Sequence, residues 1–302
     1  MNRGEVASKM GPQKEENLAS LLAKALELRG NVDIWRAYCA LEQEYHAQLG
    51  AIHHEFVHGG AKVLWWCWLQ GLPAAPDLCK VCLESLVRHM PEDWQIYVVT
   101  EENYRRFITL PEVIEKKYRQ GKISKAHFTD ILRTELLVRH GGVWVDATVY
   151  CSRDAGTFLA SYPLFLYSQI ARGCPGIPAS NWLISSIPHH PILETVRDLL
   201  HIFWQEKDAA PNYFFYHFFL NMAIGKYPEL WHLVPRYSNI PSHLLQWEML
   251  EPYNEQRMQQ LLAMASFHKL TYRIPASIPQ EQLQASFLGK LLQRKRVWQL
   301  EG

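Results

Sequence analysis

The chain has 302 residues, of which 48% are hydrophobic and 20% charged, and its formal net charge is +1. These values are ordinary for globular proteins, and the length suits one large domain with appendages or two smaller domains. The near-zero charge gives no indication of nucleic acid as a partner. No apolar run reaches the roughly 18 residues of a membrane span, and the N-terminus lacks a signal-peptide core, so we expect a cytoplasmic protein.

The N-terminal part carries two helical patterns, from residue 14 to about 57. The first pattern ends at Gly30, and the second begins at Val32 and leads toward the rest of the chain. Glycine is a frequent residue just beyond a helix end, which favours a break at this position. We therefore predict an N-terminal helical extension over residues 1–58.

A possible zinc-protease signature closes this extension, because His54, Glu55 and His58 match H-E-x-x-H. In such proteases, two histidines four residues apart on one helix face bind zinc and the glutamate acts as the general base. Two glycines follow at once, so the second histidine would lie in a fraying last turn, and no third ligand has a suitable setting downstream. The metalloprotease is kept as an alternative function.

Residues 59–275 alternate between strand and helix patterns, which is typical of a sheet flanked by helices. Short β-prone runs predict strands at Val63–Trp68, Gln95–Val99, Val143–Val145, Phe165–Tyr167 and Trp182–Ile184. Longer amphipathic or aromatic runs predict helices at Pro76–His89, Ala126–His140, Pro191–Gln205 and Tyr213–Ile224, with further helical segments from Pro111. We predict an α/β fold with a largely parallel sheet. The six cysteines are expected to be reduced thiols, and a lone C-x-x-C at Cys79 and Cys82 favours helix packing over a redox site.

The segment from Phe128 to Tyr150 is the strongest site candidate. Its helix places Asp130 and Arg133 three residues apart, and therefore on one face. Gly141 fits the left-handed position after the helix, and a short apolar strand then ends at Asp146. Ligands bind beyond the carboxyl ends of strands in open α/β sheets. The alternative is a surface ion pair and an aspartate that only begins a turn.

This segment resembles the nucleotide-sugar site of the DXD-type (sugar-binding-region) glycosyltransferases. These include capsular polysaccharide synthesis proteins, yeast initiating mannosyltransferases and clostridial glucosylating toxins. The matching motifs are TDILR at Thr129–Arg133 and GGVWVDAT at Gly141–Thr148. Further segments, including KVLWWCWLQG, NWLISSIPHHP, YFFYHFF and HKLTY, are similar to the capsular proteins in the same order, from Lys62 to Tyr272. The resemblance implies a GT-A-type fold.

The resemblance also implies roles for individual residues. Asp130 and Arg133 would bind the donor sugar, and Asp146 would bind ribose, a metal or both; these three are the predicted catalytic residues. Trp68 matches a tryptophan that stacks on uracil, whereas alternation along the strand places Trp65 and Trp66 in the core. The full set of predicted donor-binding residues is Trp68, Asp130, Arg133, Gly142, Asp146, Thr148, Asn181 and Lys269.

The second acid of D-x-D is absent, because Thr148 stands in its place. That acid usually binds Mn²⁺ or Mg²⁺ at the donor diphosphate, and hard cations prefer several oxygen ligands. The resemblance suggests Asp146 with His268 as metal ligands, and Lys269 as a point charge on phosphate. The alternative is that His268 and Lys269 are ordinary polar residues before a strand, and dependence on manganese or magnesium stays open.

The C-terminal part, residues 276–302, is predicted to be a basic helix or tail. A helix is expected over Glu281–Trp298, with basic residues at Lys290, Arg294, Lys295 and Arg296. This face could bind anionic lipid at the inner face of the membrane, close to a lipid-linked acceptor. The alternative is a helix face exposed to solvent.

Together these observations predict a hexosyltransferase that uses a nucleotide sugar, a UDP-sugar by preference. Its acceptor would be a glycan or a lipid-linked glycan in surface or capsular polysaccharide synthesis, and related enzymes retain the anomeric configuration. A degenerate protein that binds the nucleotide sugar without turnover is the non-catalytic alternative. If the site residues act only on substrate, Asp146→Ala or Arg133→Ala should abolish transfer and leave stability nearly intact.

Overall fold

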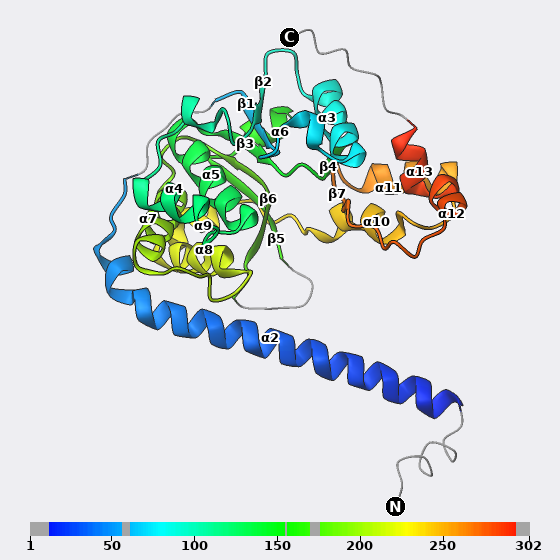
Figure 1. Ribbon diagram of the computed structural model, residues 1–302, viewed down its shortest axis with the longest axis horizontal. Coiled ribbons are helices and arrows are strands. Elements are labelled where there is room, and N and C mark those ends of the chain that lie inside the picture. The colour runs from blue at the N-terminus through cyan, green and yellow to red at the C-terminus, as the bar shows by residue number, and fades with distance from the viewer. Residues whose placement is uncertain (1–11, 56–60, 155, 170–175, 294–302) are drawn as a thin grey trace, which may run out of the picture.

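The computed structural model describes residues 12–55, 61–154, 156–169 and 176–293. Side chains are described from residue 30 onward, apart from that of residue 157. An α/β body forms the larger part of the molecule, and one long helix, α2 (Pro12–Ala51), lies along one side of it (Figure 1).

A five-stranded sheet forms the centre of the body, with strand order β2-β1-β3-β6-β5. Its strands are β1 (Val63–Cys67), β2 (Gln95–Val99), β3 (Gly142–Val145), β5 (Leu164–Ser168) and β6 (Ala179–Ser186). Strand β1 pairs in parallel with both β2 and β3, and β6 pairs antiparallel with both β3 and β5. Four strands therefore run in one direction and β6 runs against them, which confirms the predicted mixed, largely parallel sheet.

Helices cover both faces of this sheet. Trp65 points to the face packed by α5 (Lys125–His140), α7 (Pro191–Glu206) and α8 (Phe215–Lys226). Trp66 points to the opposite face, which α3 (Asp77–His89) and α6 (Gly156–Ala160) help to cover. Both tryptophans are almost fully buried, as alternation along the strand predicted. Short helices α4 (Glu112–Arg119) and α9 (Pro228–His232) and 3₁₀ turns at Leu72–Ala74 and Tyr104–Arg106 complete this region.

Helix α5 has defined signals at both ends. The Ser124 hydroxyl accepts a hydrogen bond from the His127 backbone N–H, and so caps the start. Gly141 follows the last turn with a φ of 67°, and its N–H donates to the Leu137 carbonyl. The chain then turns directly into β3, which fixes where the residue after β3, Asp146, lies relative to the helix. This helix-glycine-strand unit matches the prediction within one residue at each boundary.

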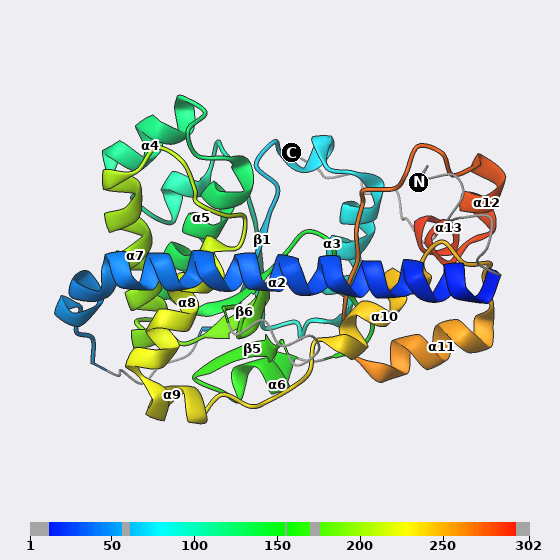
Figure 2. The ribbon, with the colours of Figure 1, turned by 90° about the horizontal axis from the view of Figure 1, so that it is seen from below.

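The N-terminal helix differs from the prediction, since α2 is one continuous helix through Gly30. A glycine in a helix interior costs only about 1 kcal/mol relative to alanine, which does not oblige a long helix to break. The second half of α2 is attached to the body, because Tyr38, Leu41 and Tyr45 are buried with the aromatic residues of α7 and α8. Figure 2 shows α2 crossing the body from end to end.

The end of α2 also bears on the metalloprotease alternative. The helix stops at Ala51, so His54 and Glu55 are not helical. The imidazole of His54 is paired on both sides, with Asp198 at 2.8 Å and Glu194 at 3.1 Å. His58 lies outside the described residues. The expectation that these residues present zinc ligands from one helix face is therefore wrong for His54.

A second, two-stranded sheet pairs β4 (Val149–Cys151) antiparallel with β7 (Phe267–Lys269). Beside it lie α10 (Ile240–Glu248), α11 (Glu255–Met264), α12 (Gln280–Ala285) and α13 (Phe287–Leu292) (Figure 1). Phe287, Leu288 and Leu291 of α13 pack into a cluster with residues of α3 and α11. The predicted single helix over 281–298 is wrong, because Ser286 separates α12 from α13 and caps the latter.

Two sequence expectations concern the environment of the chain. The thiols of Cys39, Cys67, Cys79, Cys82 and Cys151 are free, and Cys174 lies outside the described residues. Cys79 and Cys82 are both fully buried in α3, where burial raises the pKa of each thiol.

Within the described residues, no helix has the length and hydropathy needed to cross a membrane. Arg294, Lys295 and Arg296 of the predicted basic face are likewise outside the described residues.

Candidate active site

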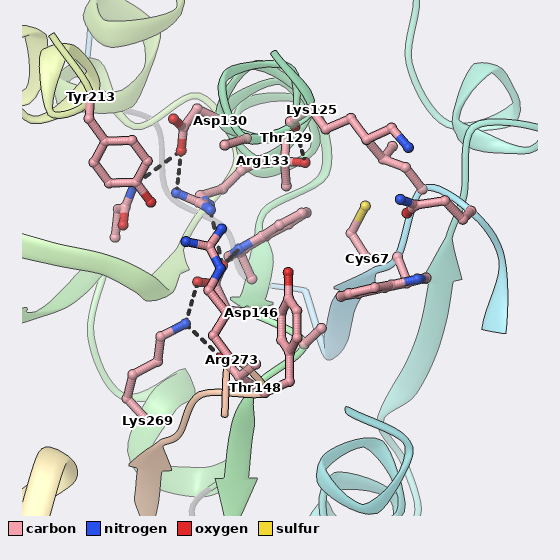
Figure 3. Close-up of a pocket in the computed structure, with 18 of the residues that line it drawn as sticks. Cys67, Lys125, Thr129, Asp130, Arg133, Asp146, Thr148, Tyr213, Lys269 and Arg273 are labelled. Carbon is pink, nitrogen blue, oxygen red and sulfur yellow. Dashed lines mark hydrogen bonds and ion pairs between the residues drawn. The ribbon is translucent and has the colours of Figure 1, made fainter. Parts of the chain in front are cut away.

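A pocket opens at the edge of the sheet where β1 and β3 reach their carboxyl ends. Trp68 follows β1, Asp146 follows β3, and Asn181 lies near the start of the antiparallel β6, so all three lie at this edge. Helix α5 forms one wall, and the segment after β7 forms another (Figure 3). This is the position at which open α/β sheets bind their ligands.

Helix α5 contributes a buried ion pair to the pocket. Arg133 Nη1 donates to Asp130 Oδ1 at 2.8 Å, and the side chains are only 5% and 11% exposed. Asn181 Nδ2 donates to the same oxygen at 3.1 Å. Arg133 Nε is buried and has no hydrogen-bond partner among the described residues, and the guanidinium lies over the ring of Trp144 at 5.0 Å. Asp130 and Arg133 are therefore not the surface pair that the alternative interpretation proposed.

Asp146 lies at the centre of the polar network. Its backbone N–H donates to the Trp182 carbonyl at 2.8 Å, which joins the residue after β3 to strand β6. Its Oδ1 accepts from Arg133 Nη2 and from Trp144 Nε1, each at 3.0 Å. Its Oδ2 accepts from Lys269 Nζ at 2.8 Å (Figure 3). Two cations thus hold one carboxylate in a fixed orientation.

The two carboxylates are in different electrostatic states. Burial raises the pKa of Asp130 to about 7, in spite of the opposing effect of Arg133. Burial also disfavours the charged form of Asp146, but Lys269 and then Arg133 hold the pKa of its carboxyl below the usual value. Asp146 is therefore ionised at neutral pH, while Asp130 lies near its titration midpoint.

Seven of the eight predicted donor-binding residues meet in this one pocket. They are Trp68, Asp130, Arg133, Asp146, Thr148, Asn181 and Lys269. The half-buried ring of Trp68 packs against the edge of Tyr272, with centroids 5.5 Å apart. The Thr148 hydroxyl accepts from Lys269 Nζ at 2.8 Å. The geometric expectation that Asp130, Arg133 and Asp146 converge on one cavity is confirmed.

Two predicted residues lie elsewhere. Gly142 does not line the pocket, and a Cβ at this position would lie 2.3 Å from the Val63 carbonyl oxygen. Its position is explained by the close approach of β1 and β3. His268 is fully buried and its Nε2 pairs with the Ser152 hydroxyl at 3.1 Å. Because successive side chains of a strand point to opposite faces, His268 faces away from the pocket that Lys269 enters.

The pocket also holds residues that the sequence did not single out. These are Lys125, Thr129, Tyr213, His217, Tyr272 and Arg273. Tyr213 and His217 belong to the YFFYHFF segment, which resembles the capsular proteins and predicted a helix but no individual site residue. His217 is 9% exposed, burial lowers its pKa to about 4, and its Nδ1 has no partner among the described residues. A histidine inside an aromatic run is the signal that could have drawn attention to it.

A divalent cation would have few ligands in this pocket. Within the described part of the chain, no group of three or more histidine, cysteine or acidic side chains is arranged to hold a metal. Asp146 is the carboxylate at the expected position, and both of its oxygens already accept from nitrogen donors. The residues present do not fit a resident Mn²⁺ or Mg²⁺, which prefer several oxygen ligands.

The chain matches a known protein family over the region that contains this pocket. The family model described as "Capsular polysaccharide synthesis protein" matches residues 32–291, which is most of the chain. The chain belongs to the capsular polysaccharide synthesis protein family. The match includes every residue of the pocket and confirms the resemblance seen in the sequence. No curated protein sequence matches the chain.

Three solved glycosyltransferase structures show a low similarity to this chain. PaToxG glycosyltransferase is 12% identical with a TM-score of 0.41, and the match covers 87% of this chain and 95% of that one. GlyE from Streptococcus pneumoniae TIGR4 is 10% identical with a TM-score of 0.40, over 78% and 63% of the two chains. The bifunctional glycosyltransferase WbbM is 9% identical with a TM-score of 0.40, over 80% and 53%.

Proposed function

We propose that this chain is a GT-A-type glycosyltransferase that moves a hexose from a UDP-sugar to a glycan or lipid-linked acceptor during surface polysaccharide synthesis. The observation that carries the proposal is the ion-paired chain of Asp130, Arg133, Asp146 and Lys269 inside one pocket. It presents hydrogen-bond acceptors and donors side by side, which suits the hydroxyl groups of a sugar.

The pocket offers separate regions for the parts of a nucleotide sugar. Trp68 and Tyr272 provide an aromatic surface for the flat base. Asp130 and Asn181, joined at 3.1 Å, provide polar groups for the sugar. Lys269 Nζ lies 2.8 Å from Asp146 Oδ2, where it suits the diphosphate. Cations aimed at a leaving group stabilise the charge that develops on it in the transition state.

Transfer breaks the bond between the anomeric carbon and the diphosphate oxygen, and the electron pair of that bond leaves with the diphosphate. The acceptor hydroxyl oxygen forms the new bond to the anomeric carbon, and its proton passes to the departing phosphate or to water. We propose retention of the anomeric configuration, as the family resemblance implies. In this scheme Arg133 orients Asp130 and Asp146 for their contacts with the donor.

The proposal is tested by calorimetric titration with a panel of nucleotide sugars, followed by donor hydrolysis assays with those that bind. We expect a UDP-sugar to bind and to be hydrolysed slowly without acceptor, and Asp130→Asn to abolish hydrolysis. Binding with no hydrolysis or transfer for any acceptor would instead support the non-catalytic alternative. Failure of every nucleotide sugar to bind would refute the proposed function.

A further inference from the structure

The place where a donor-site metal would bind is already taken by a side chain. Lys269 Nζ lies 2.8 Å from Asp146 Oδ2 and 2.8 Å from Thr148 Oγ1. These residues stand at the two acidic positions of a D-x-D motif. The ammonium group thus bridges the first acid and the replacement of the second (Figure 3).

The backbone holds Lys269 in this position. Strand β7 pairs with β4 so that Lys269 lies opposite Val149, and the following N–H, of Leu270, donates to the Thr148 carbonyl at 2.9 Å. The neighbouring Phe267 and His268 are buried. This pairing with β4 fixes the strand on which Lys269 lies. Its ammonium is directed at Asp146 rather than into solvent, and 20% of its side chain is exposed.

The charges around the pocket also favour an anion over a second cation. Among the described lining residues, Lys125, Arg133, Lys269 and Arg273 are cationic. They face two carboxylates, Asp130 and Asp146, so the lining carries a positive excess when both acids are ionised. A divalent cation at Asp146 would have to displace Lys269 and stay close to Arg133, at a Coulomb cost that grows in a partly buried site. A diphosphate would instead find compensating charges in place.

We propose that Lys269 supplies the positive charge at the donor diphosphate that a divalent metal supplies in D-x-D enzymes, so that this protein binds and uses its donor without a metal. This inference rests on the proposed glycosyltransferase function. Thr148 supports it, since a hydroxyl accepts a hydrogen bond from an ammonium but is a weak ligand for Mn²⁺. During transfer the ammonium stabilises the diphosphate as it departs with the electron pair of the broken bond.

The test uses UDP as the probe and calorimetry as the readout, on the full chain, with EDTA and then with Mn²⁺. For the unmodified protein we expect the UDP dissociation constant to agree within about twofold under both conditions. Lys269→Met keeps the length of the side chain and removes its charge, and should weaken UDP binding at least tenfold in EDTA. Lys269→Arg should restore most of the affinity, and circular dichroism checks that each variant is folded.

A designed reversal sharpens the test. The double variant Thr148→Asp/Lys269→Ala recreates two acids without the ammonium, and should bind UDP only when Mn²⁺ is present. Electron paramagnetic resonance should then detect bound Mn²⁺ in this variant and none in the unmodified protein, independently of UDP. Tenfold tighter UDP binding in Mn²⁺ than in EDTA for the unmodified protein, or undiminished binding by Lys269→Met, would overturn the inference alone. Absence of UDP binding under every condition would overturn the proposed use of a UDP-sugar together with it.

Discussion

Arg133 donates to Asp146 at 3.0 Å, and this contact joins the middle of helix α5 to the carboxyl end of strand β3. The same guanidinium also donates to Asp130, so one side chain forms ion pairs with two carboxylates. Substitution of any one of these charged residues should therefore change the charge balance at the others.

The first prediction concerns stability at this ion pair. Arg133→Met should lower the free energy of unfolding by about 3–5 kcal/mol, because it leaves the buried carboxylate of Asp130 without its cation and removes one of the two cations at Asp146. This differs from the expectation, based on the sequence, that stability would be nearly unchanged. Urea denaturation measures the effect. The double variant Arg133→Met/Asp130→Asn should recover part of the loss, and a loss below about 0.5 kcal/mol, the usual size of a surface effect, would contradict the buried pairing.

The second prediction concerns the backbone role of Gly142, the second glycine after α5. Gly142 has a φ of 88°, and an added Cβ would lie 2.3 Å from the Val63 carbonyl oxygen. Gly142→Ala should therefore cost at least about 1–3 kcal/mol from backbone strain alone, seen as a lower melting temperature. Gly225→Ala is the matched control, because its Cβ would enter open space. Equal melting temperatures for the two variants would be inconsistent with the structure.

The third prediction follows from the pKa of Asp130, which burial raises to about 7. A sugar hydroxyl donates more strongly to an ionised carboxylate, so donor binding should favour the deprotonated form. Below pH 7 a proton must then be released on binding, and the donor affinity should fall up to tenfold per pH unit. Calorimetry in buffers of different ionisation enthalpy counts this proton. Asp130→Asn should bind weakly with no such pH dependence, and an unchanged pH profile in that variant would exclude Asp130 as the titrating group.

The fourth prediction concerns the aromatic surface for the base. Trp68→Leu should weaken UDP binding about tenfold, because stacking contributes on the order of 1 kcal/mol beyond the buried area. Trp247→Leu serves as the control, since Trp247 is 62% exposed and does not line the pocket. Fluorescence titration with UDP measures both. Equal affinities would place the base elsewhere.

The fifth prediction uses His217, whose Nδ1 is buried without a hydrogen-bond partner among the described residues. A buried unsatisfied polar atom costs about 1–3 kcal/mol, so His217→Phe should leave the free energy of unfolding unchanged or raise it. If His217 contacts the substrate, the same variant should lower kcat/KM for transfer. Lower stability together with normal transfer would assign His217 a purely structural role.

The local parts of the site could be predicted from the sequence, whereas their long-range pairing could not. The α5–β3 unit has a capping serine, a continuous helical pattern and a glycine at its end, so Asp130 and Asp146 were placed correctly on their elements. The three-residue strands β4 and β7 carry too little pattern to be recognised, and they are far apart in the chain. The position of Lys269 against Asp146 depends on the pairing of β4 with β7. The same pairing shows that alternation along β7 turns His268 away from the pocket.

The errors in the helices have physical causes as well. Gly30 predicts a break from its intrinsic preference, whereas the residues on both sides of it favour the single continuous helix that the structure has. The break at Ser286 was missed, although a serine that caps a helix start is a readable signal. Burial of Phe287 and Leu288 against α3 and α11 then explains why the chain turns at this point instead of continuing as one basic helix.

The pairing of β4 with β7 has a consequence for protein synthesis. A ribosome completes the five-stranded sheet, α5 and Asp146 long before it reaches Lys269 and Arg273. A partly translated chain thus contains the residues of the sugar-facing side while it still lacks Lys269 and Arg273. Such a chain should be unable to capture the donor before Lys269 has been added, so a product that stops ahead of Lys269 should not bind UDP.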